Sequence, residues 1–144
     1  MKFADNNNQF VVFELNGEEY GIDILRVKTI EKMTNITRVP KTAPYIKGVI
    51  NLRGEIVPII DLREKFNLEK KENDDNTRII IVYVDDIEVG LIVDSASKVM
   101  DIKSDMIEAP PESLGNSEQS NIYGIGKLDD KVITLLDIEK MLTA

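Results

Sequence analysis

The residues whose chemistry stands out in this chain are clustered carboxylates, because the sequence contains neither cysteine nor histidine. Oxygen-rich clusters occur at 70–75 (KKENDD), Asp85-Asp86 and Asp129-Asp130, and such oxygens suit Ca²⁺. None has the alternating spacing of a calcium loop, and Asp is common in tight turns. We therefore expect turns, with no metal and no cofactor. A site built on carboxylates, or on Ser and Lys, remains the alternative, since Cys and His nucleophiles are excluded.

The second feature is an arginine inside an apolar run. Residues 48–63 read GVINLRGEIVPIIDLR, which predicts a buried hairpin that turns at Arg53-Gly54. A two-residue hairpin turn favours Asn, Asp or Gly, because its residues need positive φ. Arg53 is unfavourable there, and two interpretations of it are equally open at this point. It is either a recognition residue whose planar guanidinium reaches acceptors on a partner, or a solvated turn arginine.

The overall composition favours protein partners. The 144 residues are 42% hydrophobic, which suffices for a core, and their net charge is −8. That charge opposes binding to nucleic-acid phosphates, and 6% aromatic residues leave little for base stacking. No apolar run approaches the roughly 18 residues of a membrane helix, and the start MKFADNNNQF lacks a signal-peptide core. We expect a cytoplasmic protein.

The chain repeats itself. Residues 48–66 align without a gap with residues 124–142, and residues 10–22 align with residues 79–91. The two matching stretches follow the same order in both halves, which indicates a duplicated unit. Chance similarity between generic hairpins is the alternative, because alternating apolar patterns are common.

The repeat predicts an all-β protein with short helices. We place one barrel subdomain at 9–67 and a second at 78–143, joined by the polar linker 68–77. Each half holds about five strands in roughly 60 residues, the size of an SH3-like barrel. Such a unit buries little surface alone, so we expect two barrels that share a core. Asp61 and Asp137 are good N-caps for short helices.

Three stretches carry a resemblance to a known family. EEYGIDILRV (18–27), IKGVINLRGEIVPIIDLREKF (46–66) and VGLIVDSASKVMDI (89–102) resemble the CheW family of chemotaxis coupling proteins. The likeness runs from about Gln9 to Leu142, so residues 1–144 would form one CheW-like domain. It implies two intertwined five-stranded SH3-like barrels and no catalysis, in agreement with the repeat.

The resemblance also implies partners. CheW-like proteins bridge the cytoplasmic hairpin tips of chemoreceptors to the histidine kinase CheA and help to build signalling arrays. The receptor tip lies in a groove between the barrels, and the regulatory domain of CheA pairs with CheW barrel to barrel through apolar surface. The protein would therefore be cytoplasmic and recruited to membrane-associated arrays, without inserting into the membrane.

Four residues are expected at the receptor surface. The arginine that matches Arg53 is implicated in receptor binding in the family, and the strand that carries Val27 and Ile30 faces the receptor groove. Val99 is their counterpart in the second half. For the three apolar residues, ordinary barrel core is the alternative.

Two residues are expected near the kinase. The positions that match Ile56 and Arg78 lie close to the kinase contact in the family. Ile56 could equally be an inward strand residue, and Arg78 a solvated edge-strand charge. The loop 108–121 resembles the part that makes ring contacts, although Ser113 stands where a bulkier residue is expected.

One position departs from the family pattern. In some members the arginine that matches Arg53 has an acidic partner where this chain has Thr29. Glu31 lies two residues further along the same predicted strand, hence on the same face, and could replace that partner.

Two other functions stay open. A small-molecule binder or enzyme with carboxylates in a double barrel would need titratable groups that converge in a pocket. A CheW paralogue that serves a sensory pathway other than chemotaxis would share every feature described above.

Overall fold

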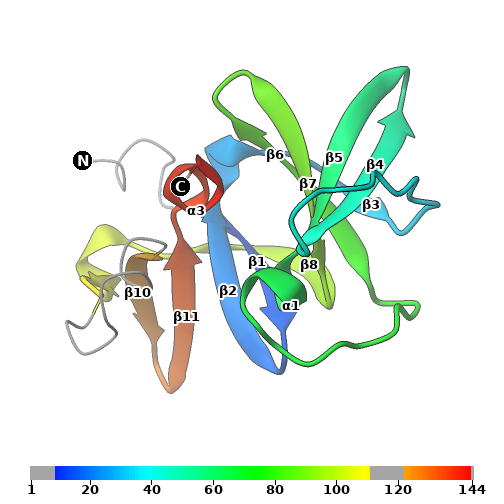
Figure 1. The fold of residues 1–144 in the computed structure, drawn as a ribbon. Coiled ribbons are helices and arrows are strands. Elements are labelled where there is room, and N and C mark those ends of the chain that lie inside the picture. The colour runs from blue at the N-terminus through cyan, green and yellow to red at the C-terminus, as the bar shows by residue number, and fades with distance from the viewer. Residues whose placement is uncertain (1–8, 111–121, 144) are drawn as a thin grey trace. The chain divides into compact units, whose positions relative to one another are not determined.

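The structure is a computed structural model that describes residues 9–110 and 122–143 (Figure 1). It confirms the predicted all-β architecture with short helices. The strands, in chain order, are β1 (Gln9–Leu15), β2 (Glu18–Asp23), β3 (Val27–Lys32), β4 (Ile46–Leu52), β5 (Glu55–Asp61), β6 (Arg78–Val84), β7 (Ile87–Val93), β8 (Ser95–Asp101), β9 (Ile107–Glu108), β10 (Ile122–Leu128) and β11 (Lys131–Leu136). Within the described ranges, no helix is long and apolar enough to cross a membrane.

Two α-helices follow closing hairpins, as expected. They are α1 (Leu62–Lys65) and α3 (Ile138–Thr143), and single 3-10 turns lie at Ile24–Arg26 and Ser104–Met106. Asp61 caps α1, because its carboxylate accepts a hydrogen bond from the Arg63 backbone N–H at 2.9 Å. Asp137 accepts one from the Lys140 N–H at 3.1 Å.

The strands form two sheets. The six-stranded sheet has the order β8-β1-β2-β11-β10-β9, and the five-stranded sheet has the order β3-β6-β7-β5-β4. Each sheet contains a parallel junction, β2 with β11 in the first and β5 with β7 in the second. The chain correspondingly divides into two compact units. Unit 1 comprises residues up to Phe13, 18–26 and the chain from residue 97, and unit 2 comprises 14–17 and 27–96.

These units differ from the ranges of the sequence repeat, 9–67 and 78–143. The β1–β2 hairpin of the first half joins a sheet whose other strands come from the second half. Conversely, the β6–β7 hairpin of the second half joins β3, β4 and β5 of the first. The halves therefore exchange hairpins, which is the intertwining that the family resemblance implies.

Connection length explains the exchange. If the β1–β2 hairpin instead joined β3, β4 and β5 of its own half, the strand order would be β3-β1-β2-β5-β4. In that order β3 would lie next to β1 and run parallel to β2. Parallel strands in one sheet need a crossover of a dozen or more residues, whereas only Ile24–Arg26 joins β2 to β3. Asp94 alone separates β7 from β8, so the same limit applies to the second half.

Each unit has its own apolar core. In unit 2 the buried cluster is Ile50, Val57, Ile59, Ile79, Ile81 and Ile92. In unit 1 it is Phe10, Val12, Ile102, Ile133 and Leu135. Equivalent glycines allow the parallel strands to pack closely. A Cβ on Gly90 would lie 2.5 Å from Ile59 Cδ1, and one on Gly21 would lie 2.7 Å from Leu135 Cδ2.

The expected hairpin turns are all present. Asn16, Arg53, Asp85 and Asp129, the first residues of the four two-residue turns, have φ values of 57°, 52°, 54° and 51°. The paired aspartates therefore occupy turns, as predicted. Among the described residues, no group of three or more acidic side chains is placed to hold a metal ion.

A partly buried ion pair joins α1 to Asp94, which follows β7. The Arg63 guanidinium donates from Nε to Asp94 Oδ1 at 2.9 Å and from Nη2 to Oδ2 at 2.7 Å. The two side chains are only 13% and 16% exposed. Asp94 also accepts a hydrogen bond from the Asn16 N–H at 2.8 Å, and Arg63 donates to the Glu69 carbonyl at 2.7 Å. The hydrogen bonds from Arg63, with that from Asn16, hold the pKa of Asp94 below its usual value.

We expect the free energy of unfolding to fall as the pH is lowered from about 5 towards 3. Folded Asp94 has a pKa below its unfolded value of about 3.9, so the folded state binds fewer protons in this range. Its stabilisation is complete above the unfolded pKa and is lost as the pH falls through the folded pKa. Urea titrations across this range measure the effect. Asp94→Asn should show a shallower pH dependence, and an unchanged slope would contradict the assignment to Asp94.

Candidate partner-binding surfaces

Arg53 lies at the β4–β5 turn in unit 2, with its side chain 69% exposed. Its φ of 52° lies in the left-handed region, which Gly, Asn and Asp adopt more readily than Arg. The turn is held by a hydrogen bond from the Gly54 N–H to Asn51 Oδ1 at 3.0 Å. Arg53 contributes nothing to a core, so its guanidinium is available to a partner.

Glu31 lies within ion-pair distance of Arg53. Arg53 Nη1 lies 3.7 Å from Glu31 Oε2, as the strand-face argument expected. An ion pair this exposed stabilises little, so its effect is to orient Arg53. The contact also joins β3 to the β4–β5 hairpin, at the other end of the strand order. The five-stranded sheet therefore curls until its ends meet.

A bulge in β3 places Val27 and Ile30 on one face. Val27 pairs with Val82 and Ile30 pairs with Ile80, with a register shift around Lys28. Simple alternation would put residues three apart on opposite faces. Ile30 is 39% exposed and Val27 is half-buried, so neither is fully buried core.

Lys28, which no pattern in the sequence singled out, lies near the tips of two hairpins. Its Nζ is 2.6 Å from Glu88 Oε2 and 4.0 Å from Glu55 Oε1. The hydrogen bond from Lys28 to Glu88 raises the pKa of the lysine. A single lysine thus links β3, β5 and β7 at this end of unit 2. Only the tertiary pairing of these strands could have indicated it.

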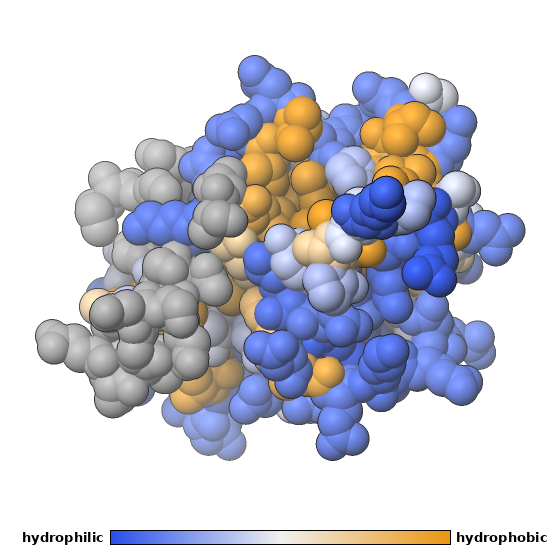
Figure 2. Space-filling view, viewed as in Figure 1, coloured by the Kyte–Doolittle hydropathy of each residue, from blue (hydrophilic) through white to orange (hydrophobic). Residues whose placement is uncertain are grey.

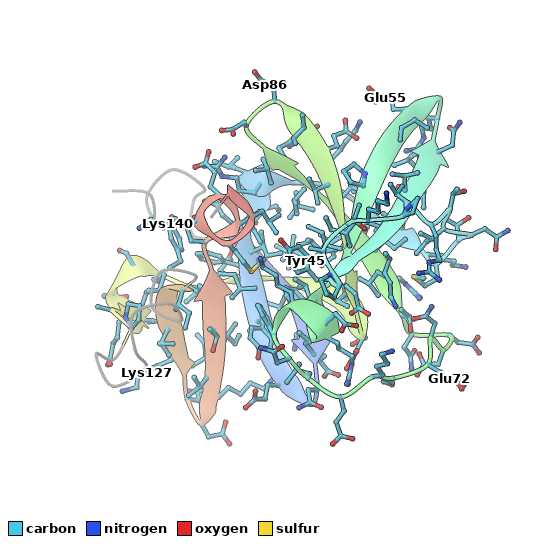
Figure 3. All side chains as sticks on the ribbon, in the orientation of Figure 1. Tyr45, Glu55, Glu72, Asp86, Lys127 and Lys140 are labelled. Atoms are coloured by element: carbon cyan, nitrogen blue, oxygen red, sulfur yellow. The ribbon has the colours of Figure 1, made fainter. Side chains whose placement is uncertain are left out.

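Ile56 is a surface residue, 65% exposed, which excludes the inward-facing alternative. Ile87, at 59%, lies beside it, because β5 and β7 pair in parallel with Ile59 opposite Gly90. Figure 2 shows hydrophobic side chains over both hairpins of unit 2, and Figure 3 shows Glu55 and Asp86 at the two hairpin tips.

Between these hairpins lies an open groove of about 290 Å³, which we call the Ile56–Ile87 groove. It is lined by Glu55, Ile56, Val57, Pro58, Asp86, Ile87 and Glu88. Four apolar and three acidic side chains line this groove, so it offers exposed apolar area next to negative charge.

The other predicted site residues lie elsewhere. Arg78 is half-buried, and its Nη1 donates to the carbonyls of Asp75 and Thr77 at 2.8 and 2.9 Å. It therefore fixes the chain just before β6. Val99 lies in β8, in unit 1, and is 49% exposed. The predicted ring-contact loop includes Ser113 and falls largely on residues 111–121, outside the described residues.

Comparison with known proteins decides the family. The family model described as CheW-like domain matches residues 9–144. The chain belongs to the CheW-like family. It is 44% identical over 134 residues to "Chemotaxis protein CheW" of Bacillus subtilis, covering 93% of this chain and 86% of that protein. It is 41% identical over 136 residues to the protein of the same name from Klebsiella aerogenes, covering 94% and 82%.

A solved CheW structure has the same fold. The scaffolding protein TtCheW from Thermoanaerobacter tengcongensis matches with a TM-score of 0.88 and 37% identity, covering 96% of this chain and 94% of that one. This match confirms the predicted fold of two SH3-like barrels. CheW-like proteins are non-enzymatic scaffolds of chemotaxis, so the chain is a chemotaxis coupling adaptor in the broad sense.

Proposed function

We propose that this CheW-like protein bridges the cytoplasmic tips of chemoreceptors to the histidine kinase CheA and supports the assembly and control of receptor arrays. In this role it acts in the cytoplasm and is recruited to arrays at the membrane. It contributes no catalysis and instead favours particular arrangements of its partners through contact. The observation that carries the proposal is the pair of exposed recognition features in unit 2, Arg53 and the Ile56–Ile87 groove, within a family of coupling scaffolds.

The receptor surface is centred on Arg53. Its exposed guanidinium, oriented by Glu31, offers up to five donors to acceptors on a receptor tip. Val27 and Ile30 share a face of β3 and supply partly exposed apolar contact area. Val99 remains our proposal for a further receptor contact in unit 1.

The kinase surface is the Ile56–Ile87 groove. Two neighbouring isoleucines, each more than half exposed, suit the apolar barrel-to-barrel contact that the family uses with the CheA regulatory domain. Arg78 is proposed as a kinase residue that acts through the backbone it holds before β6.

Two titrations test the bridging function. The purified protein is added to the regulatory domain of CheA from the same organism and, separately, to a receptor tip fragment. Binding to both, and formation of a ternary complex, is the expected result. Binding to neither folded partner would contradict the proposal and would bring the small-molecule function forward.

Ile56→Asp should weaken binding to the CheA regulatory domain at least tenfold, because docking would bury an uncompensated carboxylate. Receptor binding should change much less. The unfolding free energy should change by less than about 1 kcal/mol, because the side chain is mostly exposed. Calorimetric titration against each partner measures both effects.

Val39→Asp is the matched control, because Val39 is another exposed apolar residue of unit 2, at 40%, and lies outside the groove. It adds the same charge and should leave kinase binding within about twofold. Equal losses in the two variants would show that net charge, and not the groove, governs binding.

A further inference from the structure

Two equivalent ion pairs in the two units have opposite polarity. In unit 2, the second residue of α1 is a cation, Arg63, and it pairs with Asp94 just after β7. In unit 1, the second residue of α3 is an anion, Glu139, and it pairs with Arg26 just after β2, with 3.3 Å between Arg26 Nη2 and Glu139 Oε1. The alignment of 48–66 with 124–142 places Arg63 opposite Glu139. Continued three residues beyond its end, the alignment of 10–22 with 79–91 places Asp94 opposite Leu25, the residue before Arg26.

The two hairpins otherwise have similar patterns of buried positions in their first strands. β1 and β6 both bury their second to fifth and seventh residues. The strands that receive the hairpins also match, since the first six residues of β5 follow the same burial sequence as β11. The glycines that allow the parallel junctions, Gly21 and Gly90, occupy equivalent positions. The pattern of buried positions therefore does not distinguish β1–β2 from β6–β7, although side-chain size differs, with Phe10 and Phe13 opposite Ile79 and Val82.

A second set of equivalent ion pairs does not distinguish them either. Glu19 of β2 pairs with Lys98 of β8 at 2.9 Å, and Glu88 of β7 pairs with Lys28 of β3 at 2.6 Å. Both pairs place the anion on the hairpin and the cation on the flanking strand. Exchanging the hairpins would preserve these attractions, whereas it would change both helix pairs.

We propose that four charged residues help to determine which hairpin each closing strand and helix accepts, namely Arg26, Arg63, Asp94 and Glu139. In the native pairing, the charged second residue of each helix faces a residue of opposite charge that follows the hairpin. In the exchanged pairing, Arg63 would face Arg26, and Glu139 would face Asp94. Both attractions would become repulsions, and the mostly buried Arg63 guanidinium would lose its carboxylate.

This discrimination acts mainly between chains. Within one chain, the three-residue link Ile24–Arg26 already prevents β3 from flanking β1. Between two copies of the protein this connection-length limit does not apply. The β1–β2 hairpin of one copy could therefore pair with β5 and α1 of another copy before the β6–β7 hairpin of that copy has docked. The inverted charges oppose that pairing and so disfavour hairpin-exchanged oligomers during folding.

The double reversal Arg26→Glu with Glu139→Arg tests the proposal. It restores an ion pair in unit 1 with reversed polarity. It also leaves a cation on both helices and an anion after both hairpins, so either hairpin could form an ion pair with either helix. We expect the full-length variant to keep a wild-type urea midpoint. After refolding at high protein concentration, its oligomeric fraction in size-exclusion chromatography with light scattering should be about fivefold larger than that of wild type.

Two controls decide the cause. Glu108→Lys with Lys127→Glu reverses an exposed ion pair within the second half, where Nζ and Oε2 are 3.0 Å apart, and should refold as wild type does. Arg26→Gln with Glu139→Gln removes the unit 1 pair without creating a new attraction, and its oligomeric fraction should stay below that of the double reversal. A wild-type level of oligomer in the double reversal would overturn the proposal. So would an equal level in the Gln variant, because lost stability would then explain the effect.

Discussion

Replacing Arg53 with glutamate is expected to reduce receptor binding at least tenfold while CheA binding stays within about twofold. The substitution reverses the charge of an exposed recognition residue and removes the ion pair with Glu31, whose carboxylate lies 3.7 Å from the native guanidinium, so the new side chain turns away. The unfolding free energy should change by less than about 1 kcal/mol, because the turn is exposed and the ion pair is weak. Parallel titrations with a receptor tip fragment and with the CheA regulatory domain measure the difference.

Arg53→Asn separates recognition from backbone conformation. Asn tolerates a φ of 52° better than Arg, so this variant should be as stable as wild type or slightly more so. It should nevertheless lose most of its receptor affinity. Lys70→Glu makes the same change in net charge as Arg53→Glu at an exposed linker position and should bind normally. Intact receptor binding by both Arg53 variants would assign the arginine to the solvated turn alternative.

Removal of the Asp94 carboxylate is expected to have the largest effect on stability. Asp94→Ala leaves the Arg63 guanidinium, 13% exposed, without its bidentate partner, and it removes the acceptor for the Asn16 N–H. Loss of one member of a buried pair costs about 3–5 kcal/mol, and partial exposure places this case near the lower end, about 3 kcal/mol. Urea denaturation at neutral pH measures the change, and both partners should still bind while the variant is folded.

Two comparisons sharpen that measurement. Asp94→Asn keeps an acceptor for the Asn16 N–H and should lose less stability than Asp94→Ala. Glu108→Ala removes an ion pair with Lys127 whose side chains are 63% and 59% exposed, and should cost less than about 1 kcal/mol. Similar losses in Asp94→Ala and Glu108→Ala would contradict the assignment of a structural role to this partly buried pair.

Local chemistry made much of the fold predictable. Asn16-Gly17 and Arg53-Gly54 mark turns because few residues adopt positive φ, and the structure shows both. Asp61 and Asp137 mark helix starts because their carboxylates accept backbone N–H groups, and both do so. These signals depend on a few neighbouring residues, so turns and helix starts can be predicted without knowledge of the tertiary fold.

The candidate site was predictable only in part. The unfavourable turn position singled out Arg53, and strand alternation correctly placed Glu31 within its reach. Ile56 was selected through the family, but the groove also needs Ile87, which lies far along the sequence on another hairpin. Their proximity follows from a parallel junction, and nothing in a local pattern specifies which parallel strands will meet.

The sequence by itself therefore determined the strands, turns and caps, because these depend on neighbouring residues. It also determined the internal repeat and the family, because both are found by comparing stretches of sequence directly. Tertiary structure decided which hairpin joins which sheet, that a bulge at Lys28 brings Val27 and Ile30 to one face, and that Arg63 meets Asp94. The two halves have nearly the same pattern of buried positions, so this pattern does not specify their pairing, which depends on connection length, on the sizes of the packed side chains and on a few charges. Those determinants act only once distant segments are in contact.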